Sequence, residues 1–256
     1  MSKLTSILDA DVSQSVTPEL LKNLTPELLN VFTSPELLKG LQAFFSFIGS
    51  GVDIQGIFDI EDAFAKQEAR TSHIAYLKSI PEVAQIFEER YIGPTHDVKE
   101  LIKLPKDSLG YAYAYNLREV NYPAGFYPPV DVLDDVSYYS LRMRQTHDIW
   151  HTVSGYGLTL FGGIGITVFQ FAQNRDPVGP ILLAGDILNS IKMHRDLDTY
   201  MDIVHEAYKA ARQAKPFLAQ KWEEAWEKPL AEWRAELNVP PVKDPDRPVY
   251  MPLAAV

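Results

Sequence analysis

Hydrophobic residues recur along most of this chain at the three- and four-residue spacing of helices that bury one face. Two clear cases are the stripe over 74–89, interrupted by Pro81, and the block over 107–119. The same spacing predicts further helices over 57–67, 135–151, 180–194, 196–214 and 217–237. The alternating runs typical of strands are essentially missing, so the sequence predicts an all-α fold.

The two ends of the chain differ from this helical region. Three repeats of the form Ser/Thr-Pro-Glu-Leu-Leu begin at Thr17, Thr25 and Ser34. Each is typical of the first turn of a short helix, with a capping residue and proline at the first helical position. We therefore expect an N-terminal helical arm at 1–50, a single multi-helix domain at 51–242 and a proline-rich tail at 243–256. Packing over the domain is the favoured role of the arm, and binding a partner or a membrane is the alternative.

Composition narrows the classes of function. The net charge is −10 and the basic residues are scattered, which argues against nucleic-acid binding. Cysteine is absent, which excludes disulfides and thiolate metal sites. Residues 152–174 carry no charge, but their five glycines and several polar residues favour a buried segment over a membrane span. The N-terminus shows no signal-peptide or transit-peptide pattern.

The segment His147-Asp148-Ile149-Trp150-His151 is the strongest candidate for a chemical site. Histidines four residues apart lie one turn apart on the same helix face, so both imidazoles can reach one cation. Asp148 projects about 100° round the helix, where it can ligate from the edge or hold an imidazole. The alternative is a pair of helix histidines bonded to their neighbours. Arg142 and Arg144, one turn or less before His147, are candidates to pair with an anionic ligand, and solvated surface arginines are the default alternative.

Glycines cluster directly after this motif, at Gly155, Gly157, Gly162, Gly163 and Gly165. Because glycine costs up to ~1 kcal/mol relative to alanine in a helix, the cluster indicates a turn followed by close helix packing, or room for a ligand chain. The hydrophobic candidates for lining such a chain are Phe161, Ile164, Val168 and Phe169.

Trp222, Trp226 and Trp233 recur on the predicted helix over 217–237. We expect them to form a core seam, with a membrane-interface role as the alternative.

Three groups of residues together resemble the coenzyme Q (ubiquinone) biosynthesis protein 4 family. They are Ser108-Leu109-Gly110-Tyr111, the run from Arg144 to His151 with Gly155, and the tryptophan-rich segment over 222–237. The resemblance covers roughly 75–242 and is most specific at the His-Asp motif.

The family pattern is HDxxH followed, after eleven residues, by a glutamate that is held to complete a divalent metal site. His147, Asp148 and His151 match this pattern, whereas the glutamate position is Gly163. The resemblance therefore implies a Zn²⁺ or Mg²⁺ site that lacks one carboxylate, and the mixed nitrogen and oxygen donors fit zinc better. Asp186 or Glu206 are candidates to replace the missing ligand.

The resemblance also implies function. It points to an all-helical protein that binds a polyprenyl quinone precursor or another isoprenoid lipid and organises other quinone-biosynthesis proteins. Family members are also linked to the metal-assisted removal of a carboxyl group from the ring of the precursor. The resemblance leaves open whether this chain catalyses that step or acts only as an organiser. The expected location is cytoplasmic with peripheral membrane contact, or the mitochondrial inner membrane in a eukaryote, and a homodimer is an open alternative.

The leading hypothesis places the lipid head group near His147, Asp148 and His151, assisted by Arg144, and the tail among the hydrophobic residues that follow. The rival hypothesis is a helical protein–protein interaction scaffold without a small-molecule site.

Overall fold

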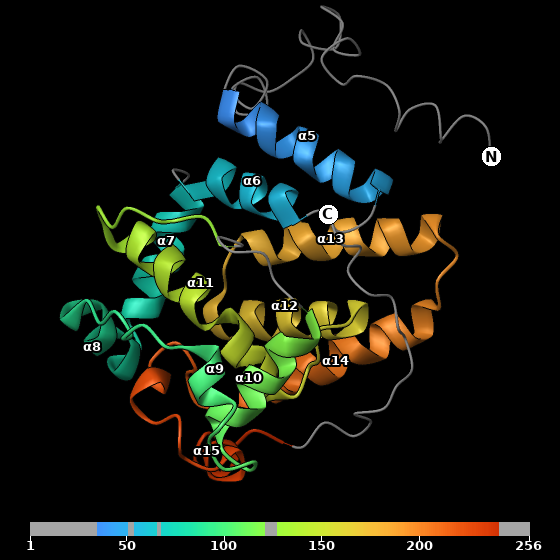
Figure 1. Ribbon diagram of the computed structural model, residues 1–256. Helices are drawn as coiled ribbons and strands as arrows, with labels where there is room; N and C mark the ends of the chain where they lie inside the picture. Colours follow the sequence, from blue (N-terminus) through green and yellow to red (C-terminus); the bar gives the residue numbers. More distant parts are fainter. Residues whose placement is uncertain (1–34, 51–53, 66–67, 121–126, 241–256) are drawn as a thin grey trace, which may run out of the picture. The chain divides into compact units, whose positions relative to one another are not determined.

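The computed structural model describes residues 35–50, 54–65, 68–120 and 127–240. These residues are mostly helical and contain no strand, which confirms the predicted all-α fold. The first two proline-led repeats and the proline-rich tail after residue 240 lie outside them. The chain divides into two compact units, one formed by 1–70 and 177–197 and the other by 71–176 and 198–256 (Figure 1).

The described residues of the first unit include the helices α5 (Pro35–Ser50), α6 (Ile54–Ala65) and α13 (Val178–Lys192). The third proline-led repeat begins α5, which at 16 residues is longer than the short turn expected from the repeat. Hydrophobic residues continue at helical spacing after the repeat, so the helix continues with them. Helix α5 therefore packs within this unit against α6 and α13.

Residues far apart in the sequence hold α13 against α5. Asn189 Nδ2 donates to the carbonyl oxygen of Ile48 at 3.0 Å, and Lys192 Nζ donates to that of Gly49 at 2.7 Å. These bonds satisfy carbonyl groups that the end of a helix leaves without partners. A Cβ at Gly185 would collide with the ring of Phe47, so this approach of the two helices requires glycine.

The second unit holds the remaining helices and the predicted site. In chain order these are α7 (Glu68–Lys78), α8 (Pro81–Glu89), α9 (Val98–Leu101), α10 (Leu109–Val120), α11 (Asp135–Ser154), α12 (Leu160–Asn174), α14 (Leu197–Gln213), the 3-10 helix η1 (Trp222–Glu224) and α15 (Leu230–Glu236). Pro81 separates α7 from α8, as its position in the hydrophobic stripe predicts. No helix among the described residues is both long and apolar enough to cross a membrane.

Aromatic side chains form the core of the second unit. Trp150 packs against Phe217 with ring centroids 5.2 Å apart, Phe217 against Trp222 at 5.3 Å, and Trp222 against Trp233 at 4.7 Å. The predicted core position of Trp222 and Trp233 is confirmed, since both are buried. Trp226 is half-buried and lies 4.9 Å from the ring of His96.

The prediction of a continuous helix over 217–237 is wrong. This segment forms a 3-10 turn and the short helix α15, which begins after Pro229. Proline has no N–H to continue a helix ladder. Instead, Leu109 N donates to Lys228 O at 2.9 Å and Leu230 N donates to Asp107 O at 2.8 Å. The segment thus pairs with residues 107–109, at the start of α10, rather than with itself.

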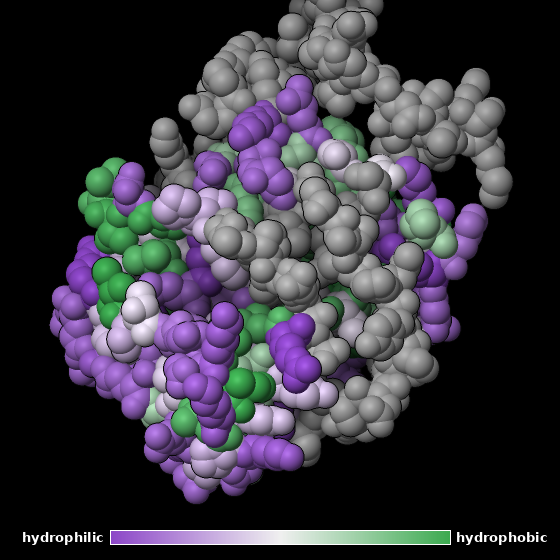
Figure 2. Space-filling view, viewed as in Figure 1, coloured by the Kyte–Doolittle hydropathy of each residue, from purple (hydrophilic) through white to green (hydrophobic). Residues whose placement is uncertain are grey.

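Helix α11, which carries the His-Asp motif, has well-defined ends. Asp134 caps its N-terminus in a capping box with Ser137. Gly155 ends the helix with a φ of 84°, a conformation that favours glycine. Arg234 donates to the carbonyl oxygens of Thr152 and Val153 at 3.1 and 2.9 Å, so the last turn is held by a side chain from α15. Figure 2 shows a hydrophobic area near the start of α11, where the preceding Leu133 is 88% exposed.

Candidate metal centre

Helix α11 brings His147, Asp148 and His151 together. One ligand atom from each lies within 4.8 Å of the others, and the two Nε2 atoms are 3.2 Å apart. Asp148 and His151 are buried and His147 is half-buried. Among the described residues, no other group of three such side chains converges in this way. Neither Asp186, which lies in the first unit, nor Glu206 joins the group.

His151 is oriented by the main chain of the turn after α11. Its Nδ1 lies 2.7 Å from the carbonyl oxygen of Tyr156, which can only accept, so the imidazole donates its Nδ1 proton there. Burial, together with the smaller effect of the neighbouring His147, lowers the pKa of His151 to about 4. At neutral pH the ring is therefore neutral, and its Nε2 presents a lone pair towards His147.

His147 is held from a second helix. Gln170 on α12 places its side-chain Nε2 2.9 Å from Nδ1 of His147. Burial lowers the pKa of His147 to about 4 as well, so both rings are neutral at pH 7. Neutral imidazole is the form in which histidine binds a metal ion.

Asp148 is held by a residue from the segment before α11. The hydroxyl of Tyr127 lies 3.2 Å from both Oδ1 and Oδ2 of Asp148, to which it donates. Arg144 fixes this segment, because its Nη1 donates to the carbonyl oxygen of Pro128 at 3.0 Å.

Sequence reasoning placed Arg144 as a partner for an anion and did not identify Tyr127 or Gln170. No spacing rule connects either residue to the motif, because both reach it only through tertiary packing.

The buried Tyr113 is affected by the charge of Asp148. Burial raises the pKa of Tyr113, and the negative charges of Asp148 and Glu223 raise it further. Its hydroxyl, 3.2 Å from Nε2 of His96, stays protonated at neutral pH. Glu223 is in turn paired with the buried Arg142, whose Nη1 donates to it at 2.7 Å.

The glycines after the motif have distinct packing roles. A Cβ at Gly162 would collide with the main chain of Gly157, and one at Gly165 would collide with the ring of Tyr156. The predicted turn is therefore confirmed, and these two glycines allow α12 to pack closely against that turn. Gly163 differs, because a Cβ there would meet no atom within 4 Å. The position at which the family pattern has a glutamate is thus open space beside a half-buried glycine.

The hydrophobic residues predicted to line a lipid site lie on α12. Ile164, Val168 and Phe169 are buried and Phe161 is half-buried. Phe169 belongs to the aromatic core, 4.9 Å from the ring of Phe217. The structure therefore places Phe161 nearer to solvent than the other three.

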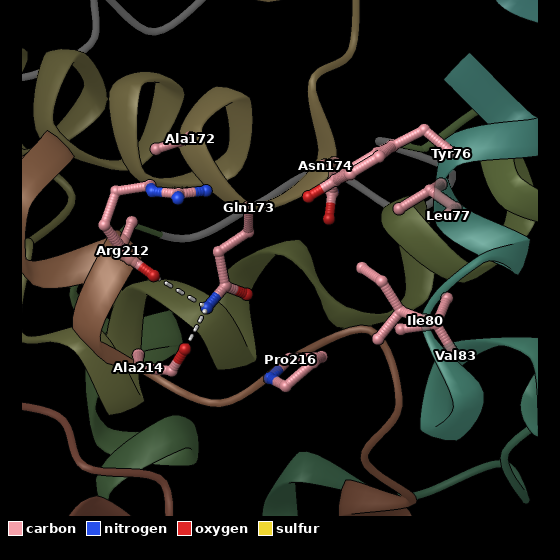
Figure 3. A pocket seen from close by; sticks show the side chains of 11 residues that line it. Tyr76, Leu77, Ile80, Val83, Ala172, Gln173, Asn174, Arg212, Ala214 and Pro216 are labelled. Atoms are coloured by element: carbon pink, nitrogen blue, oxygen red, sulfur yellow. Dashed lines mark hydrogen bonds between the residues drawn. The ribbon is translucent and has the colours of Figure 1, made fainter. Parts of the chain in front are cut away.

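A hollow with a volume of about 100 Å³ lies elsewhere in the second unit (Figure 3). Ile80 and Val83 lie across it from Gln173, whose amide donates to main-chain carbonyls at the end of α14. Typical ligand pockets have volumes of about 300–1,000 Å³, so this hollow is small for a prenyl chain. None of the predicted lipid-binding residues lines it.

Known proteins match the region that contains the site. A family model described as "Coenzyme Q (ubiquinone) biosynthesis protein Coq4" matches residues 67–243. A protein of Nostoc punctiforme, known from a crystal structure, is 32% identical with a TM-score of 0.70, and the match covers 78% of this chain and 96% of that one.

Curated relatives match a shorter stretch. The mitochondrial ubiquinone biosynthesis protein COQ4 of Kluyveromyces lactis is 30% identical over 152 residues, which is 58% of this chain and 45% of the relative. The mitochondrial COQ4 homolog of Rattus norvegicus is 28% identical over 176 residues, covering 64% and 63% respectively. The chain thus spans about half to two thirds of the length of these relatives. Because the family model matches most of the sequence, including the His-Asp motif, the chain belongs to the coenzyme Q (ubiquinone) biosynthesis protein Coq4 family.

Proposed function

We propose that this chain acts in ubiquinone biosynthesis and holds the polar head of a polyprenylated quinone precursor at a divalent metal ion bound by His147, Asp148 and His151. The observation that carries the proposal is the convergence of one ligand atom from each of these side chains within 4.8 Å. Family membership supplies the pathway, since the relatives are named for ubiquinone biosynthesis.

The donor set fits a zinc ion better than magnesium. Two imidazole nitrogens and one carboxylate are typical zinc ligands, whereas magnesium prefers oxygen donors and retains several waters. The bond from Nδ1 of His151 to the Tyr156 carbonyl leaves its Nε2 for the ion. Three protein ligands with a remaining open position are the arrangement of catalytic zinc sites. When bound, the ion would polarise a ring carboxylate or hydroxyl oxygen of the precursor.

The surrounding residues orient the ligands of the site. Tyr127 fixes the carboxylate of Asp148, and burial keeps His151 neutral and ready to ligate. Tyr113 keeps its proton and can donate a hydrogen bond to a charged oxygen of the head group. The open space at Gly163 leaves room for an oxygen of the precursor where the family pattern has a protein carboxylate.

The prenyl tail is proposed to follow α12 from the site. Phe161, Ile164, Val168 and Phe169 supply the hydrophobic surface of that helix, and Phe161 is the member that a tail can reach without opening the core. Arg144 supports the head-group side by holding the segment that carries Tyr127. Other quinone-biosynthesis proteins and a membrane surface are the proposed partners, in keeping with the mitochondrial location in the names of the relatives.

Extraction of the purified full chain with organic solvent, followed by mass spectrometry, tests lipid binding. A recovered isoprenoid or quinone supports the proposal, whereas protein that is repeatedly empty after expression in a quinone-producing host favours the scaffold hypothesis. His151→Ala is expected to reduce the recovered head-group-bearing lipid. The matched control is His205→Ala, which removes an exposed histidine of α14. Equal recovery from both variants would contradict a role of the motif in ligand binding.

A further inference from the structure

We propose that Gln170 sets the tautomer of His147, donating its amide N–H to Nδ1 in the metal-free protein and turning its amide oxygen to Nδ1–H when a metal ion is bound. This inference rests on the proposed metal site and adds a positioning residue to it. The observation behind it is the contact between Gln170 on α12 and the Nδ1 atom of His147 on α11, at 2.9 Å.

His151 fixes where the protons lie in the metal-free pair. Its Nδ1 proton is donated to the Tyr156 carbonyl, so its Nε2 carries a lone pair. That Nε2 lies 3.2 Å from Nε2 of His147. Two lone pairs facing each other at this distance repel, and a proton on Nε2 of His147 turns the contact into a hydrogen bond.

With its proton on Nε2, a neutral His147 has a lone pair on Nδ1. Gln170 satisfies this lone pair only by presenting its amide N–H, which is how the side chain is placed. The contacts at the two ends of this hydrogen-bond chain are therefore compatible with the same proton positions on the two histidines. The Tyr156 carbonyl accepts from His151, His151 accepts from His147, and His147 accepts from Gln170.

Metal binding reverses the last step of this chain. For both Nε2 atoms to bind one ion, His147 would lose the proton on Nε2 and gain one on Nδ1 by exchange with solvent. The ring stays neutral and no net proton is released. Nδ1–H now needs an acceptor, and a half-turn of the Gln170 amide supplies its oxygen. A glutamine offers both a donor and an acceptor at one position, which neither a carboxylate nor a hydrophobic side chain does.

The consequence is that Gln170 stabilises the site in both states. Groups that accept the N–H of a metal-bound histidine orient the ring and raise its basicity, and their loss typically costs about 10- to 100-fold in metal affinity. Gln170→Met removes both hydrogen-bonding groups at similar side-chain length. Gln170→Glu can only accept, and so favours a proton on Nδ1 of His147 even without metal.

Nuclear magnetic resonance of the full chain labelled with ¹⁵N-histidine reads the tautomers directly. In the metal-free wild type, Nδ1 of His147 is expected to be unprotonated and Nδ1 of His151 protonated. Zinc, or the Gln170→Glu substitution without zinc, is expected to protonate Nδ1 of His147. Gln145→Glu is the control, because it adds the same charge on α11 at a side chain that accepts from Arg142 instead. A metal-free wild type with His147 already protonated at Nδ1, or an unchanged spectrum of Gln170→Glu, would overturn the proposal.

Zinc titration by calorimetry at pH 8 tests the consequence for affinity. Gln170→Met is expected to bind zinc about 10- to 100-fold more weakly than wild type, and Gln170→Glu at least as tightly as wild type. A Gln170→Met affinity within twofold of wild type would refute the role of Gln170 in the metal-bound state. If the wild type takes up no zinc, the proposed function fails. The metal-free spectra of wild type and Gln170→Glu still decide whether Gln170 controls the tautomer.

Discussion

Gly163→Glu restores the carboxylate that the family pattern has and this chain lacks, and the structure indicates that the change is tolerated. Gly163 and Gln170 are seven residues apart on α12, which is two helical turns, so they share the face that meets His147. Gly163 is the member nearer to the turn that joins α11 to α12. A Cβ at this position would meet no atom within 4 Å, so the new side chain enters open space.

Two effects of the substitution must be separated. Replacing a glycine inside a helix by a good helix former such as alanine or glutamate stabilises the fold by about 0.5–1 kcal/mol, because less backbone entropy is lost on folding. Gly163→Ala gives this effect alone and is the matched control. The added carboxylate is expected to tighten zinc binding at least tenfold, which corresponds to about 1.4 kcal/mol of additional stabilisation when zinc is in excess.

Thermal unfolding with and without saturating zinc measures both effects. Without zinc, both variants are expected to unfold about 1–4 °C above wild type, since 1 kcal/mol corresponds to roughly 2–4 °C in a chain of this size. With zinc, Gly163→Glu is expected to gain about 3–6 °C more than Gly163→Ala. Equal zinc-induced shifts in the two variants would refute the inference that residue 163 faces the metal site.

Three further predictions concern the rest of the fold. Glu223→Ala leaves the buried charge of Arg142 without its carboxylate partner. The free energy of unfolding, measured in urea, is therefore expected to fall by about 3–5 kcal/mol. A fall below about 1 kcal/mol would contradict the importance of this pair. Burial raises the pKa of Asp186 from 3.8 to about 7, so the folded state binds more protons than the unfolded state between these values and its stability falls as pH rises through this window. Asp186→Asn is expected to remove that dependence in melting curves from pH 4 to 8, and parallel curves for the two proteins would count against it. Gly165→Ala forces a Cβ against the ring of Tyr156 and is expected to cost about 1–3 kcal/mol, measured by the same urea unfolding, with an unchanged midpoint as the contrary result.

Local features of the structure follow closely from the sequence. The four-residue spacing of His147 and His151 places both rings on one face because α11 is a regular helix there. Asp134 begins that helix and Gly155 ends it, in the roles that these residue types fill at helix ends. Each of these features depends on a few neighbouring residues, which is why local sequence is informative about them.

Features that depend on distant residues were not predictable in this way. Tyr127 and Gln170 reach the motif across 21 and 23 residues, and nothing in their local sequence distinguishes them from surface tyrosines and glutamines. The break in the tryptophan-rich segment was missed for a similar reason. Its spacing fits a helix. The helix is interrupted at Pro229 because Lys228 and Leu230 form main-chain hydrogen bonds with residues 107–109 instead.

The zinc content of the purified chain tests the central claim most directly. The wild type is loaded with excess zinc, passed through gel filtration and measured by elemental analysis beside the double variant His147→Ala/His151→Ala. The expected result is one zinc ion per wild-type chain and none in the double variant. A wild type that retains no zinc, or a double variant that retains as much, would contradict a metal site formed by His147, Asp148 and His151.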